Sequence, residues 1–151
     1  LQEDIHPLVV SWGWENENPS TSKFLDWHEW QGTRDMSAFL TIPAAIKFLE
    51  KHNWLEVSRK CRKQVVHTRN QFLDLLGISH PCPDSWLGQM ASIPLPIYDE
   101  NIFKKELLER YHIQVPVFNW KGNAYLRYSI QAYNSESDLE KLLSAVKELL
   151  S

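Results

Sequence analysis

The stretch VPVFNWKGNAYLRYSI, residues 115–130, contains two apolar runs of strand character on either side of a short polar turn. Lys121, Gly122 and Asn123 form that turn, which suits a tight connection between two antiparallel strands. Pro116 lacks a backbone donor, so it belongs at a strand start or on an edge strand. The stretch therefore predicts an antiparallel hairpin.

The segments around this hairpin extend the pattern in both directions. Residues 89–95, QMASIPL, predict a further strand, and Asp99 is placed to cap a helix that follows it. After the hairpin, apolar residues recur at helical spacing from about Asp138 to Leu150. The order strand, helix, strand, strand, helix predicts an α+β fold, an α/β sandwich with a small, mostly antiparallel sheet covered by helices.

Two helices are expected before this part of the chain. The first is predicted over about 42–52, with Thr41 as its N-cap, and the second from Trp54 to a C-terminal Gly77. On the second helix, the basic residues are assigned to the faces away from the core: Arg59, Lys60, Arg62, Lys63 and Arg69.

The first thirty residues are expected to form a packed loop after a short strand over 7–12. Four tryptophans stand in this polar segment: Trp12, Trp14, Trp27 and Trp30. Aromatic side chains in such a setting need a second surface to lie on. That surface is the rest of this fold, a missing domain or another subunit.

Composition excludes several classes of function. The 151 residues have a formal net charge of -3, which gives no basic field for nucleic acid, and no stretch is suited to crossing a membrane. We expect a cytoplasmic protein. Cys61 and Cys82 form no metal-binding motif and are assigned structural roles, with Cys82 in a rigid Pro-Cys-Pro connector. The six histidines are scattered, so no metal site is predicted.

Two places in the sequence are candidates for binding an anion. Gly32 and Thr33 precede a predicted helix, where backbone donors and a hydroxyl can hold a phosphate, although the pair is also compatible with a plain turn. Arg127 lies inside an apolar strand. Its guanidinium either clamps a carboxylate or points to solvent beside Tyr125 and Ser129 through strand alternation.

A family resemblance bears on these alternatives. In chain order, the segments PLVVSWG (7–13), WQGTRDMSA (30–38) and LRYSIQAYN (126–134) resemble class V aminotransferases. The form of 30–38, together with GQMAS at 88–92, is similar to the isopenicillin N epimerase-like branch of that family.

The resemblance implies the C-terminal part of a fold type I enzyme that uses pyridoxal 5'-phosphate (PLP) and forms a homodimer. Residues 1–35 would belong to or pack on a missing large PLP domain, and 36–151 would form the small C-terminal domain. Gly32 and Thr33 would contact the PLP phosphate of the partner subunit, and Arg127 would bind the α-carboxylate of an amino-acid substrate.

The resemblance also implies what this chain lacks. The Schiff-base lysine of the family lies upstream of the 7–13 segment, so no catalytic residue is expected here and the chain alone is expected to be inactive. Lys23, the lysine nearest the start, is assigned to a polar loop. Residues 117–124 contain no cysteine, which argues against a persulfide-forming desulfurase.

Two functions remain open from the sequence. The parent protein is either a PLP enzyme acting on an amino acid, as an epimerase or carbon-sulfur lyase, or a free-standing, non-catalytic binding or assembly module of the same fold.

Overall fold

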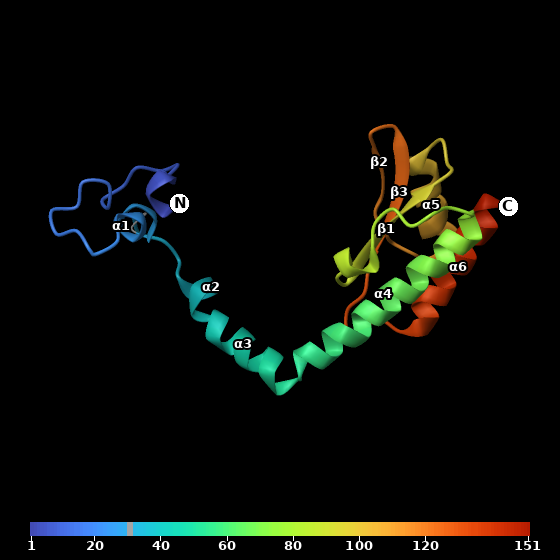
Figure 1. Cartoon of the computed structure of the whole chain (residues 1–151), viewed down its shortest axis with the longest axis horizontal. Coiled ribbons are helices and arrows are strands. Elements are labelled where there is room, and N and C mark those ends of the chain that lie inside the picture. Colours follow the sequence, from blue (N-terminus) through green and yellow to red (C-terminus); the bar gives the residue numbers. More distant parts are fainter. Residues whose placement is uncertain (30–31) are drawn as a thin grey trace. The chain divides into compact units, whose positions relative to one another are not determined.

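The computed structural model describes residues 1–29 and 32–151, which form two compact units, Leu1–Leu49 and Glu50–Ser151 (Figure 1). The second unit is built on a three-stranded sheet of β1 (Met90–Leu95), β2 (Val117–Trp120) and β3 (Asn123–Ser129). The spatial order is β1-β3-β2, and both pairs of neighbours are antiparallel. The predicted sheet and hairpin are confirmed.

The hairpin turn follows from two residues with positive φ. Lys121 has φ 50° and Gly122 has φ 81°, the left-handed pair that matches the twist of a two-residue connection. The Asn119 side chain accepts a hydrogen bond from the Gly122 N–H at 3.0 Å. Pro116 immediately precedes the edge strand β2, where its missing donor breaks no internal ladder bond.

Three helices pack on one face of the sheet. They are α4 (Trp54–Leu76), α5 (Glu100–Tyr111) and α6 (Glu136–Leu150), which share one core with the inward side chains of the strands (Figure 1). Leu126 and Val65 lie at the centre of that core, and both are fully buried. This arrangement is the predicted α+β fold.

Local signals fix the ends of these helices. Gly77 ends α4 at φ 64°, and the Ile78 N–H donates to the Leu73 carbonyl at 3.1 Å. The Asp99 carboxylate caps α5 by accepting from the N–H groups of Asn101 and Ile102. α6 begins with a reciprocal capping box between Ser135 and Asp138.

The first unit contains η1 (Gln2–Asp4), α1 (Lys23–Glu29), α2 (Ser37–Leu40) and most of α3 (Ile42–Lys51). The strand predicted over 7–12 is wrong. The described residues of this unit provide no neighbouring strand, and an apolar run without a hydrogen-bonding partner does not become a strand.

Two further local predictions are wrong in this unit. Lys23 begins helix α1 instead of lying in a loop, and its ammonium lies 4.3 Å from the centre of the Trp27 ring. Thr41 is not an N-cap, because its hydroxyl donates backward to the Ala38 carbonyl at 2.7 Å.

The tryptophans of the first unit differ in how they are covered. Trp14 and Trp27 stack at 4.5 Å between ring centres, and the His6 ring stacks on Trp27 at 5.3 Å. Trp27 is buried, whereas Trp12 remains 80% exposed and Trp30 lies outside the described residues. The prediction that this group lies on a second surface therefore stays a prediction, and Trp12 is the side chain left exposed to meet one.

None of the described helices combines the length and apolar character needed to cross a membrane.

The hydroxyl of Tyr128 ties the sheet to α4. It donates to the Val65 carbonyl at 2.7 Å, and burial raises the pKa of this tyrosine. Val65 lies within α4, so its carbonyl still accepts a hydrogen bond within the helix when the Tyr128 hydroxyl is removed. Tyr128→Phe should lower the free energy of unfolding by about 0.5–1.5 kcal/mol in urea titrations.

The pH dependence of the same variant provides a second measurement. Because the folded-state pKa is raised, the buried phenol stays protonated after the unfolded chain ionises above about pH 10. Its contribution to stability is thus lost as pH rises, and the difference between wild type and Tyr128→Phe should shrink there. Tyr133→Phe, at an 84% exposed position, is the control. A variant as stable as wild type at neutral pH would contradict a stabilising role for this hydrogen bond.

Candidate functional site

The two faces of the sheet differ because side chains alternate along β3. Leu126 and Tyr128 point into the core, whereas Tyr125, Arg127 and Ser129 point to the opposite face. No helix of the fully described second unit covers that opposite face. We call it the open face.

Arg127 lies in the middle of the open face. It is opposite Ser92 of β1 in the ladder, and its backbone N–H donates to the Pro116 carbonyl at 2.9 Å. Its side chain is exposed, and among the residues that the structure describes no carboxylate lies within ion-pair distance of it. The structure thus places Arg127 where alternation predicts, with a guanidinium available to an external anion. Its role as a carboxylate clamp stays a prediction.

The loop of Gly32 and Thr33 is also exposed. Gly32 has φ 87°, a conformation that favours glycine, and a Cβ built there would meet nothing within 4 Å. Trp30 and Gln31, which belong to the same motif, lie outside the described residues. Glycine is therefore favoured at position 32 by backbone conformation and not by a close neighbour.

The short helix after this loop already has an anion at its start. The Asp35 carboxylate accepts from the Ser37 backbone N–H at 2.8 Å and from the Ser37 hydroxyl at 2.9 Å. These hydrogen bonds hold the pKa of Asp35 below its ordinary value. Since α2 has only four residues, any phosphate contact must come from the Gly32-Thr33 loop itself.

The predicted contact of Gly32 and Thr33 with a PLP phosphate stays a prediction, and the exposure of the loop is compatible with it. Thr33 is exposed and the space beside Gly32 is open, so a phosphate could approach this loop from outside. Such an outward contact suits a phosphate held by another subunit, as the family resemblance implies. The two candidate positions, Arg127 and Gly32-Thr33, belong to different units of the chain.

Next to Arg127, the open face borders a recess of about 520 Å³ that the sequence did not reveal. Phe118, Trp120 and Tyr125 form its aromatic side, and Met90 and Ser92 line it from β1. The opposite wall includes Pro81, Cys82 and Leu87 from the connection between α4 and β1, with Arg69 at its base. We call this feature the aromatic recess.

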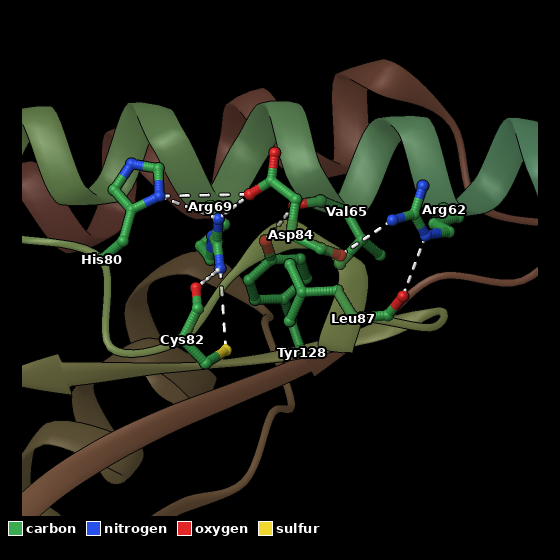
Figure 2. A network of polar contacts seen from close by, with 8 residues as sticks. All are labelled: Arg62, Val65, Arg69, His80, Cys82, Asp84, Leu87 and Tyr128. Carbon is green, nitrogen blue, oxygen red and sulfur yellow. Dashed lines mark hydrogen bonds and ion pairs between the residues drawn. The ribbon is translucent and has the colours of Figure 1, made fainter.

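Arg69 holds that connection against α4 (Figure 2). Its guanidinium donates to the Cys82 carbonyl at 3.0 Å, lies 3.1 Å from His80 Nδ1, and forms an ion pair with Asp84. Only 1% of Arg69 is exposed, so the prediction that it lies away from the core is wrong. Helical periodicity assigns a basic residue to the solvent-exposed face of its helix. It contains no information about a loop that later packs over that face.

The two cysteines match their predicted structural roles. Cys61 is buried in the core, and Cys82 is half-buried within the connection that Arg69 holds. Pro81 and Pro83 flank Cys82, and each proline ring fixes the φ angle of its own residue in this connection.

Comparison with known proteins gives the class of this chain. No family model matches it. Isopenicillin N epimerase from Amycolatopsis lactamdurans is 31% identical over 157 residues, which cover 96% of this chain and 39% of that protein. L-cysteine desulfhydrase from Arabidopsis thaliana is 29% identical over 173 residues, covering 99% of this chain and 37% of that protein.

Among solved structures, 8-amino-7-oxononanoate synthase from Francisella tularensis superposes with a TM-score of 0.46 and 21% identity. The superposition covers 68% of this chain and 31% of that chain.

The sequence relatives are PLP-dependent enzymes of the class V type, and this chain is homologous to them over nearly its whole length. Its homologues include isopenicillin N epimerases, which the motifs at 30–38 and 88–92 indicated, and also L-cysteine desulfhydrases. The chain spans about two fifths of the length of the curated relatives it matches.

The clamp around Arg69 can be tested against an exposed counterpart. Arg62 donates to the carbonyls of Leu87 and Asp84 in the same connection, at 2.9 and 2.8 Å, but from an exposed position (Figure 2). Arg69→Lys keeps the positive charge but loses the planar guanidinium that makes several hydrogen bonds in a buried position. It should therefore lower the free energy of unfolding by roughly 1–3 kcal/mol.

Arg62→Lys should cost clearly less, because water replaces the hydrogen bonds of an exposed group. Urea titrations give both values, and hydrogen exchange over residues 80–87 reports whether the connection loosens. An equal loss of unfolding free energy in the two variants would mean that burial of Arg69 does not strengthen its contribution to stability.

Proposed function

We propose that this chain is the C-terminal part of a PLP-dependent enzyme that acts on the α-carbon of an amino acid, as an epimerase or a carbon-sulfur lyase. The observation that carries the proposal is the 31% identity to an epimerase through 96% of the chain. The chain is also similar to an L-cysteine desulfhydrase over 99% of its length, so the proposal includes carbon-sulfur lysis as well as epimerisation.

Arg127 supplies the substrate contact in this proposal. A guanidinium can form two parallel hydrogen bonds to a carboxylate, which fixes both the position and the rotation of the group it binds. Arg127 is exposed on a strand that is held in place on both sides by ladder partners. The amino acid would therefore be oriented by a rigid element, which favours reaction at one bond of the α-carbon.

Gly32 and Thr33 supply a second contact, to the phosphate of PLP held by the partner subunit of a homodimer. Their exposure and the open backbone at Gly32 support this role. When bound, PLP acts as an electron sink for the carbanion formed at the α-carbon. Residues of this chain would position the substrate and the cofactor, while the lysine that carries the cofactor would come from elsewhere in the protein.

The alternative is a non-catalytic binding module of the same fold. The reading frame upstream of Leu1 separates the two proposals. A large domain with a Schiff-base lysine encoded there supports the enzyme, and a start codon close to Leu1 supports the module.

The clamp proposal predicts a specific kinetic defect in the full-length enzyme. Arg127→Ala should lower kcat/KM by about 30- to 1,000-fold, on the order of 2–4 kcal/mol, because a charge-assisted bidentate contact is lost. Arg127→Lys should recover part of this loss, since an ammonium keeps the charge and loses the fork.

Arg59→Ala is the matched control, because Arg59 is an exposed arginine in a long, 4.0 Å ion pair with Glu56. Thermal melts must show that each variant folds. A folded Arg127→Ala enzyme with near-normal kcat/KM would contradict the proposal that Arg127 binds the substrate carboxylate.

The proposal also predicts what residues 1–151 do without the rest of an enzyme. No lysine of the chain stands in the family's His-Lys context. Purified chain incubated with PLP and reduced with borohydride should show no stoichiometric modification of a single lysine by mass spectrometry, and no turnover of amino acids. The heat-denatured chain sets the level of random lysine labelling. One lysine labelled to completion in the native chain alone would contradict the proposal.

A further inference from the structure

The aromatic recess lies directly beside Arg127. Ser92, which lines the recess, is the ladder partner of Arg127 on β1. Tyr125, which also lines it, precedes Arg127 by two residues and therefore shares its face of the sheet. Arg127 is not itself among the residues that line the recess, but it shares a face of the sheet with two residues that do, so the recess adjoins its position.

The aromatic side of the recess is preorganised. The Phe118 and Tyr125 rings stack at 6.0 Å between centres, and the Trp120 ring meets Tyr125 edge-on at 6.2 Å. Phe118 and Tyr125 are also ladder partners, so the backbone fixes this pair. A ligand would contact rings that are already ordered, which lowers the entropy cost of binding.

Within the second unit, the recess is also apolar and uncovered. Trp120 is 56% exposed and Met90 is 47% exposed. None of the described residues that line the recess is acidic, and the Arg69 cation at its base is paired with Asp84. The surface therefore suits an apolar group attached to an anion, with Arg127 as the site for that anion.

We propose that the aromatic recess binds the side chain of the amino acid whose carboxylate Arg127 holds, and that this side chain is large and apolar or aromatic. The inference rests on the proposed function. Trp120 and Tyr125 are then specificity-determining residues. A side chain as small as that of cysteine would leave most of a recess of about 520 Å³ unfilled.

Binding to the 151-residue chain itself tests this inference without any reaction. Two-dimensional amide NMR would follow titrations with N-acetyl-L-phenylalanine, N-acetylglycine and N-acetyl-L-phenylalanine amide. The first probe has a carboxylate and a ring, the second lacks the ring, and the third lacks the carboxylate.

N-acetyl-L-phenylalanine should bind roughly tenfold more tightly than N-acetylglycine, because its ring is buried against aromatic side chains. Shifts should centre on residues of β1, β2 and β3 that line the recess. Trp120→Ala should remove most of the difference between the two probes, and Arg127→Gln should weaken both. Tyr98→Ala, at a fully exposed position away from the recess, is the control and should change neither.

The outcomes separate this inference from the proposed function. Equal affinity for N-acetyl-L-phenylalanine and N-acetylglycine, with both lost in Arg127→Gln, would overturn the recess inference and leave the carboxylate clamp in place. If Arg127→Gln left the affinity for both N-acetyl-L-phenylalanine and N-acetylglycine unchanged, the proposed carboxylate contact of Arg127 would be overturned instead. Ring-dependent binding at a surface other than the recess would also overturn the inference.

Discussion

The alternation of side chains along β3 is the constraint on which the rest of this structure depends. Leu126 and Tyr128 must enter the core between the helices, so Arg127 between them must point the other way. A slip of one residue would bury a guanidinium and expose the core. The hairpin turn at Lys121 and Gly122 and the ladder to β1 fix the register that prevents this slip.

Covering only one face of the sheet has a consequence for function. The helices α4, α5 and α6 bury the apolar side chains of that face, which leaves the open face available for polar and aromatic residues. The connection between α4 and β1 is held by Arg69 and Arg62, so one wall of the aromatic recess is fixed to the longest helix. Stability and the shape of the open face therefore depend on the same contacts.

Much of this fold could be predicted because its signals are local. The turn at Gly122, the cap at Asp99 and the end of α4 at Gly77 are each determined by a few adjacent residues. The strand predicted over 7–12 failed because strands require a partner, and periodicity in one segment cannot show whether a partner exists. Burial of Arg69 was missed because the loop that covers it lies beyond the end of its helix.

The candidate site could be predicted only in part. The sequence identified Arg127 and its two possible orientations, and the structure places it on the open face. The recess beside it combines side chains from all three strands and from the connection between α4 and β1, an assembly that no single motif reports. Gly32 was found through its motif, and its positive φ supplies a conformational reason for glycine there.

A crystal structure of the whole protein with a bound, unreactive amino-acid analogue tests the central claim most directly. If Arg127 is the clamp, both carboxylate oxygens of the analogue should lie about 3 Å from its guanidinium nitrogens. A carboxylate bound elsewhere, with Arg127 still facing solvent, would contradict it.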